Sequence, residues 1–542
     1  MAHNDKDASD LPPAGDKAQD ATGAGVEAPG RPAVTLSPFE PITLPGGRAA
    51  ALRDDGQVIQ IGFPELGGPM FHQTKALEIA DGRLRVLHDM GEDGQVITEV
   101  DLSFRWTLAD HVTAVQPYIM YGQSLALNLG HDLSLTTAPV APGRAVRYLN
   151  AGAGAQMSVS DRPGRDKADF GPCHFPESDL DALGDLVEER GESPVSASVR
   201  GFLPALPDDT GVVATNHARG GMTIVKLLPK RLAAGRGTGI QYAGLLRAAV
   251  RTQQFCAAHG RRMRQPIVSF IQGETFEPAD WTRYGDHLVT LQAALTEDLG
   301  KITGSTSEVL VFTDQTAVIS ETGRTYSPDH PPAALVQLRV SQAQPGRFIC
   351  VGPKYFLPRR ATIKGRGDPV HLLPSASLLL GEYHGRAIRQ ALGGQTWVPL
   401  HVASYRRTGA VIRLGIAGGD GSPLALDTDL VRDTSSSLHG LRWVQEGGDL
   451  RQVTELTLLD REIVVKLDGD PGSAGRDFVR AALTIGLFGE IPRIDDGPTT
   501  GGRTNIRDTC PDLSCTGHPM YNWLCHDWFW ETSDLGPENR AE

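Results

Sequence analysis

Hydrophobic positions recur with a period of two on both sides of a central part of the chain, where the period becomes helical. Residues 36–112 hold short alternating runs, such as 84–87, separated by Asp-Gly and Gly-Gly pairs, and this predicts a small β module. After residue 392 the alternation returns, for instance at 462–467. It predicts a β-sandwich over residues 393–542.

The central part, residues 113–392, alternates between strand and helix patterns. Apolar spacing predicts helices at about 240–259, 281–302, 332–343 and 375–392, with strands at 267–271, 309–312 and 348–351. Repeated β-α units of this kind form a mainly parallel sheet with helices on both faces. The predicted fold class is therefore α/β.

Two stretches lack a clear period. Residues 1–35 are rich in Ala, Gly, Asp and Pro, and such a segment buries too little apolar surface to offset its ordering entropy, so a disordered tail is expected. Residues 130–214 look long and irregular, apart from a short helix expected at 181–189. We expect this insertion to lie over the face that carries the active site.

A candidate nucleophile follows the first strand of the central part. The apolar run 118–121 stops at Gly122, and Ser124 comes two residues later. A serine in this position presents its hydroxyl at the carboxyl edge of a sheet. Far downstream, Asp368 and His371 have a spacing that lets a carboxylate fix the tautomer of an imidazole facing the serine.

Three short motifs therefore occur in a fixed order: Gly-Gln-Ser at 122–124, Gln-Gly-Glu at 272–274 and Asp-x-x-His at 368–371. In this order the sequence resembles the SGNH hydrolase superfamily, specifically the sialate O-acetylesterase-like carbohydrate esterases. The resemblance covers residues 113–392 and implies a flavodoxin-like SGNH hydrolase domain. Many esterases of this type carry a C-terminal β domain, including ones encoded in phage and prophage tail regions.

The resemblance implies a serine esterase that removes O-acetyl groups from a carbohydrate through an acyl-enzyme, without a cofactor. Ser124 would be the nucleophile, His371 the general base and Asp368 its orienting acid. The alternative, a glycan-binding tail or adhesion protein that kept only the fold, is favoured by Leu125, since the family usually has Asn there, and by the long insertion.

The family's oxyanion hole maps onto three groups. They are the amide of Ser124, the amide of Gly221 with Gly220 as the alternative, and the side chain of Gln272. Glu274 is expected to support Gln272 or a loop. A second departure follows this motif, where Thr275-Phe276 replaces the family's Ser-Asp or Ser-Asn.

Charge and composition limit the partners. The net charge of −13 argues against nucleic-acid or anionic-membrane surfaces, and an O-acetylated glycan fits better. The sequence shows neither a signal peptide nor a run of 18 apolar residues. We therefore expect the chain to reach its glycan within a phage-like tail or virion, with a cytoplasmic enzyme as the alternative, and assembly of several copies is left open.

The remaining Cys, His and aromatic residues receive plainer interpretations. Six scattered cysteines predict reduced thiols, and the spacing of the Cys and His residues at 510–526 does not match a common zinc site. Aromatic residues at 521–530 are expected to pack in a core, with a sugar-binding platform as the alternative. His217 is close in sequence to Gly220 and Gly221 and could touch substrate, but a loop histidine is more often solvated.

Overall fold

The computed structural model describes residues 41–44, 48–52, 58–60, 72–80, 83–89, 95–101, 108–127, 134–148, 182–188, 191–233, 237, 239–275, 281–317, 332–360, 362–363, 366–367, 370–431, 438–445, 450–470, 477–481 and 503–530. The tail expected at residues 1–35 lies outside these ranges, as do Asp368 and Cys173.

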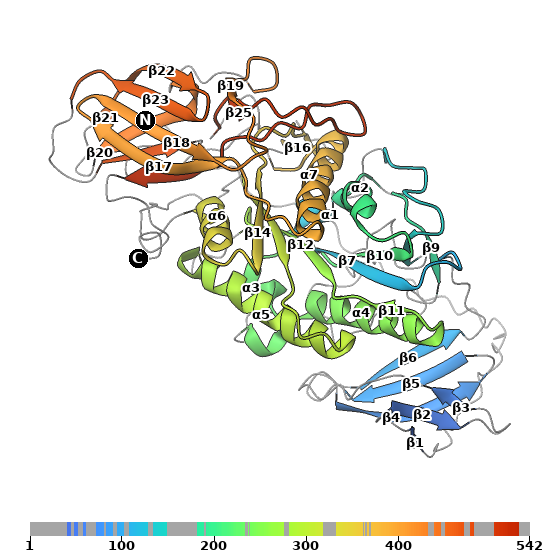
Figure 1. Cartoon of the computed structure of the whole chain (residues 1–542). Coiled ribbons are helices and arrows are strands. Elements are labelled where there is room, and N and C mark those ends of the chain that lie inside the picture. The colour runs from blue at the N-terminus through green and yellow to red at the C-terminus, as the bar shows by residue number, and fades with distance from the viewer. Residues whose placement is uncertain are drawn as a thin grey trace, which may run out of the picture. The chain divides into compact units, whose positions relative to one another are not determined.

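The central sheet has the order β14-β13-β12-β7-β10-β8-β9, with β11 pairing beside β7 (Figure 1). All of its strand pairs are parallel except β8 with β9. The strands are β7 (Ala114–Gly122), β8 (Ala145–Tyr148), β9 (Leu183–Asp185), β10 (Thr210–Asn216), β11 (Arg262–Met263), β12 (Ile267–Ile271), β13 (Val311–Gln315) and β14 (Phe348–Pro353). The predicted α/β class with a mainly parallel sheet is confirmed.

Helices cover both faces of this sheet, as predicted (Figure 1). One apolar core lies between the sheet and α4 and α5, and a second lies between the sheet and α2 and α7. The α-helices are α1 (Ser124–Leu127), α2 (Pro194–Phe202), α3 (Ile224–Leu227), α4 (Ile240–Ala258), α5 (Tyr284–Thr303), α6 (Ala333–Ala343) and α7 (Pro374–Leu392). The 3-10 turns are η4 (Leu203–Ala205), η5 (Lys230–Leu232), η6 (Trp281–Arg283) and η7 (Leu438–Gly440).

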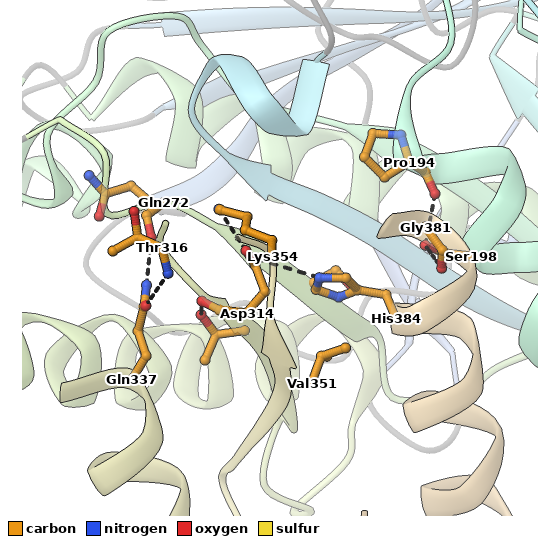
Figure 2. Close-up of polar contacts among 12 residues, drawn as sticks. Pro194, Ser198, Gln272, Asp314, Thr316, Gln337, Val351, Lys354, Gly381 and His384 are labelled. Atoms are coloured by element: carbon orange, nitrogen blue, oxygen red, sulfur yellow. Dashed lines mark hydrogen bonds and ion pairs between the residues drawn. The ribbon is translucent and has the colours of Figure 1, made fainter. Parts of the chain in front are cut away.

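Helices α2 and α7 approach each other closely because glycines line their contact. A Cβ on Gly381 would overlap the carbonyl oxygen of Pro194. Ser198 in α2 donates its hydroxyl to the carbonyl of Gly381 at 3.0 Å, and also to that of Pro194 at 2.8 Å (Figure 2). A larger side chain at Gly381 would force the two helices apart.

The described parts of residues 130–214 contain regular elements, whereas residues 149–181 of the expected insertion lie outside the described ranges. The described parts supply strands β8, β9 and β10 and helix α2, so they extend the central sheet and cover one face of it. The helix expected at 181–189 is wrong, because Leu183–Asp185 forms β9 and pairs antiparallel with β8. Tertiary pairing overrides the weak local pattern here.

Antiparallel strands flank the α/β domain in sequence on both sides. Residues before it form the sheets β1-β2-β3 and β4-β5-β6, with β1 (Pro41–Leu44), β2 (Arg48–Leu52), β3 (Val58–Gln60), β4 (His72–Ala80), β5 (Arg83–Asp89) and β6 (Gln95–Asp101). A separate two-stranded hairpin, between β14 and α7 in the chain, pairs β15 (Thr362–Ile363) with β16 (Arg366–Gly367). The predicted β module is thus built of antiparallel strands, and the domain boundaries stay predictions.

The C-terminal part contains two four-stranded antiparallel sheets, β17-β18-β23-β22 and β21-β20-β24-β26, and the pair β19-β25. Its strands are β17 (His401–Thr408), β18 (Val411–Ala417), β19 (Leu424–Leu426), β20 (Leu441–Gln445), β21 (Leu450–Arg451), β22 (Val453–Leu459), β23 (Glu462–Leu467), β24 (Asp477–Ala481), β25 (Ile506–Asp508) and β26 (Asp527–Trp530). Ile412 of one large sheet and Trp443 of the other share an apolar core. This arrangement matches the predicted sandwich.

No helix among the described residues is long and apolar enough to cross a membrane.

Candidate active site

Ser124 begins a helix immediately after the central strand. β7 is buried along its whole length and ends at Gly122, whose φ of +135° is open to glycine alone. The backbone amide of Gln123 then donates to the carbonyl of Ile271 at 2.9 Å, and Ser124 starts α1. β10 lies on one side of β7 and β12 on the other. Ser124 therefore lies where the strand order reverses, at the carboxyl edge of the sheet, which is where α/β sheets bind ligands.

The loop after β10 is tied to this turn. Asn216 is buried, donates its side-chain amide to the carbonyl of Ala126 at 2.7 Å and accepts from the amide of Ala218 at 3.1 Å. The amide of Arg219 donates to the carbonyl of Gly122 at 3.0 Å. Gly220 and Gly221 follow in a turn, so the expected glycines lie on a loop that is anchored to the nucleophile turn.

The side chain of Gln272 reaches the same loops from the end of β12. Its Nε2 donates to the carbonyl of Thr275 at 2.9 Å and makes longer contacts of 3.3 Å with the carbonyl of Met222 and with Oε1 of Gln123. Gln337 from α6 holds the backbone, donating to the carbonyl of Gln272 at 2.7 Å (Figure 2). Gln272 thus links the Gly221 loop to the residue that precedes Ser124.

Glu274 contacts Gln123 and a buried ammonium. Its Oε2 accepts from Nε2 of Gln123 at 2.8 Å, and its Oε1 lies 2.6 Å from Nζ of Lys354. Its side-chain contacts are thus with Gln123 and Lys354, and the expected role of Glu274 in supporting Gln272 or a loop stays a prediction.

Lys354, which follows β14, lies between two carboxylates. Its Nζ is 2.6 Å from Oε1 of Glu274. It is also 2.6 Å from Oδ2 of Asp314 at the end of β13 (Figure 2). All three side chains are 1% exposed. Burial alone would lower the pKa of Lys354, but Asp314 and then Glu274 more than offset this effect and hold the pKa above its usual value. Burial would raise the pKa of Asp314, yet Lys354 and then His384 keep it below its usual value. Lys354 and Asp314 therefore both carry a charge at neutral pH.

His371 lies in the segment that leads into α7. Its carbonyl accepts from the amide of Arg360 at 2.9 Å, and Leu373 donates to the carbonyl of Pro358 at 3.1 Å. Residues 354–360 follow the carboxyl end of β14, so His371 is on the same edge of the sheet as Ser124. The pairing of Ser124 with His371, and the role of Asp368, stay predictions.

His217 is not the solvated loop residue that was expected. Its backbone amide donates to the carbonyl of Met120 at 2.9 Å, which draws the residue beneath the nucleophile turn, and the side chain is 1% exposed. Burial lowers the pKa of His217 to about 3. A neutral imidazole therefore occupies this position across the physiological range.

The described cysteines and the C-terminal Trp523 are explained by the packing and chemistry of their neighbours. The described cysteines, Cys256, Cys350, Cys510, Cys515 and Cys525, are free thiols, as predicted. Within the described ranges, no group of three or more His, Cys, Asp or Glu side chains could hold a metal ion. Trp523 is 2% exposed and stacks on Phe356 with ring centroids 5.0 Å apart, so core packing is confirmed for this residue.

No protein-family model and no curated protein sequence matches the chain. Among solved structures, a carbohydrate acetylesterase from Xanthomonas citri is similar with 13% identity and a TM-score of 0.45, over 92% of this chain and 97% of the other. Est24, a carbohydrate acetylesterase from Sinorhizobium meliloti, is similar with 11% identity and a TM-score of 0.22, over 52% and 99%. The protein NanS is similar with 14% identity and a TM-score of 0.32, over 52% and 99%.

Sequence reasoning missed Asn216 and Lys354. Each directly follows or ends a buried strand of the central sheet, and that position was the available signal, because carboxyl ends of parallel strands meet at one edge. Neither residue belongs to a recognised motif, so their roles follow only from the hydrogen bonds of Asn216 and the ion pairs of Lys354 in the folded chain.

Proposed function

We propose that the chain is a serine esterase that removes O-acetyl groups from a carbohydrate through an acyl-enzyme. The observation that carries the proposal is the turn from Gly122 to Ser124 at the switch point of a parallel sheet, to which the loops of Gly221 and Gln272 are tied. A serine held in this way, with donors on neighbouring loops, suits attack on an ester carbonyl. The carbohydrate substrate is supported by the resemblance of the three motifs.

In this mechanism His371 takes the proton of the Ser124 hydroxyl as the oxygen attacks the ester carbonyl, and it then gives the proton to the departing sugar alkoxide. In deacylation the same imidazole takes a proton from water as the water attacks the acyl carbonyl. It returns that proton to the Ser124 oxygen when the acyl bond breaks and acetate is released. Asp368 would orient the imidazole and stabilise its charged form.

The oxyanion of each tetrahedral intermediate would receive hydrogen bonds from the amides of Ser124 and Gly221, with Gly220 as the alternative to Gly221. The amide of Ser124 is in the first turn of α1, so helical hydrogen bonds do not use it. Gln272 would be the third donor. Its contacts of 3.3 Å are long, and an oxyanion is a stronger acceptor than the neutral oxygens that hold the amide there.

Two observations bear on the non-catalytic alternative. Leu125, in α1, is buried in the core, which gives its departure from the family pattern a packing explanation. The described parts of residues 130–214 contribute strands and a helix to the α/β domain.

Hydrolysis of p-nitrophenyl acetate and of O-acetylated glycans tests the proposal. We expect acetate release by the wild-type chain and none above background by Ser124→Ala. Wild-type protein that is folded yet releases no acetate from either class of substrate would refute the esterase.

The larger setting is a separate proposal. We propose that the chain acts within a phage-like tail or virion, where the flanking antiparallel sheets would provide assembly or glycan contacts. Mass spectrometry of purified particles tests this: their lack of the polypeptide would favour the cytoplasmic alternative and leave the esterase proposal unaffected.

A further inference from the structure

The buried ammonium of Lys354 contacts Glu274, and Glu274 in turn contacts Gln123 in the nucleophile turn. Burying an ion is costly, and a buried ion pair adds little net stability compared with apolar residues of the same size. The cluster of Lys354, Glu274 and Asp314 therefore calls for an explanation other than stability. The hydrogen bonds that leave the cluster provide one.

One branch leads to the site. Glu274 uses one carboxylate oxygen for Lys354 at 2.6 Å and the other for Nε2 of Gln123 at 2.8 Å. Oε1 of Gln123 in turn accepts from the amide of Thr275 at 3.2 Å and from Gln272 at 3.3 Å. The side chain of Gln123 is thus held at both of its polar ends, and Ser124 is the next residue along the chain.

The other branch leads away from the site. Asp314 lies 3.6 Å from Nε2 of His384 in α7 (Figure 2). Nδ1 of His384 lies 3.1 Å from the hydroxyl of Ser269. The hydroxyl of Tyr118 donates to Ser269 at 3.0 Å. This branch joins α7 to the middle of β12 and β7.

We propose that Lys354 is a positioning residue for the esterase reaction: it fixes Glu274, which fixes Gln123 and with it the place of Ser124 and of the Gln272 amide. The proposal rests on the proposed function. Without the ammonium, Oε1 of Glu274 would lose its ion pair in the core, and the carboxylate would turn toward other donors. That change would release Nε2 of Gln123.

The two carboxylates provide a matched pair of variants. Each is buried and lies 2.6 Å from the same ammonium, but only Glu274 contacts Gln123. Nζ of Lys354 and Nε2 of Gln123 each donate to a different oxygen of Glu274. A glutamine at 274 has only one acceptor oxygen, so it loses its contact with one of the two donors. Asparagine at 314 keeps one acceptor oxygen for Lys354 and turns an amide nitrogen toward Nε2 of His384, outside the site.

The experiment measures kcat and KM on p-nitrophenyl acetate, together with thermal unfolding, for Lys354→Met, Glu274→Gln and Asp314→Asn. A misplacement of about 1 Å can cost about 10²-fold in rate, so we expect kcat to fall at least about tenfold for Lys354→Met and Glu274→Gln, with KM within about threefold. For Asp314→Asn we expect kcat within about threefold at a similar loss of thermal stability.

A double variant completes the test. If Lys354 acts through Glu274, adding Lys354→Met to Glu274→Gln should lower kcat by less than about twofold more. Equal losses of kcat in Glu274→Gln and Asp314→Asn would overturn the inference and leave the esterase intact, and this comparison decides the matter even if Lys354→Met does not fold. Wild-type protein without any turnover would overturn both proposals.

Discussion

Gly122 offers a sharp test of the nucleophile turn, since a single methyl group should disrupt it. A Cβ at this position would overlap the carbonyl oxygen of Ile271 and lie 2.7 Å from its carbonyl carbon. Ile271 pairs with Gly122 between β12 and β7, and its carbonyl accepts the amide of Gln123. The overlap can be relieved only if the two strands separate at the point where that hydrogen bond forms.

The magnitude for Gly122→Ala follows from three contributions. Placing a non-glycine residue at a φ of +135° costs about 1–3 kcal/mol, relieving the overlap costs about 1–3 kcal/mol, and the weakened hydrogen bond costs about 1 kcal/mol. The sum, about 3–7 kcal/mol, is a large part of the roughly 5–15 kcal/mol that stabilises a typical domain. At about 2–4 °C per kcal/mol, the thermal midpoint of the α/β domain should fall by about 6–28 °C.

Gly221→Ala is the matched control. Gly221 also has a positive φ, +68°, but among the described atoms none lies within 4 Å of a Cβ built there. Only the left-handed strain of about 1–2 kcal/mol remains, so a midpoint shift of about 5 °C is expected. Scanning calorimetry of the full chain, with kcat measured on the folded fraction, compares the two. A shift for Gly122→Ala no larger than that for Gly221→Ala would refute the close packing of β7 on β12.

Three further outcomes are expected. Ser124→Ala and His371→Ala should each lower kcat by about 10⁴-fold without unfolding the chain, and Asp368→Asn should lower it by a comparable or smaller factor. Activity within about tenfold of wild type for Ser124→Ala or His371→Ala would exclude this triad. Asn216→Leu should destabilise the turn by about 1–3 kcal/mol, because the carbonyl of Ala126 loses its donor, and circular-dichroism melting measures this. His217, with its pKa lowered to about 3 by burial, binds fewer protons in the folded than in the unfolded state between that value and about 6.5, so the free energy of unfolding should fall as the pH falls. By pH 4.5 the loss from His217 should be about 2–3 kcal/mol, and urea titrations of His217→Leu should lack that part of the pH dependence.

Sequence patterns predicted those elements whose apolar faces are long enough to show a period. Helix α4 and helix α7 fall within one or two residues of their expected bounds, because 19 residues each give several turns of apolar spacing. Strand β8 has four residues and β9 three, too few for a period to be visible, and their burial depends on neighbours that the sequence does not reveal.

The same distinction applies to the site. Ser124 and Gln272 could be predicted because each follows a strongly apolar strand within a recognisable motif. Lys354 could not, since a lysine after a strand is usually exposed. Its burial requires Glu274 and Asp314, which come from the ends of two other strands, and their convergence follows from the order of strands in the sheet.

Arg386 shows why the α/β domain and the C-terminal residues depend on each other. From α7 its guanidinium donates to the carbonyl of Met520 at 2.7 Å and to Oδ1 of Asn522 at 2.6 Å, and its central carbon lies 4.9 Å from the ring centroid of Trp397. A planar guanidinium held by two acceptors and an aromatic face leaves little freedom of rotation. Helix α7 begins three residues after His371, so the segment that carries Met520 and Asn522 fixes the helix that in turn fixes the approach of the proposed base. Because these contacts are buried, removing the C-terminal part would leave the buried charge of Arg386 without its acceptors. Helix α7 would then shift, and the proposed base His371 would lose its position relative to Ser124 even though no group that contacts the substrate had been removed.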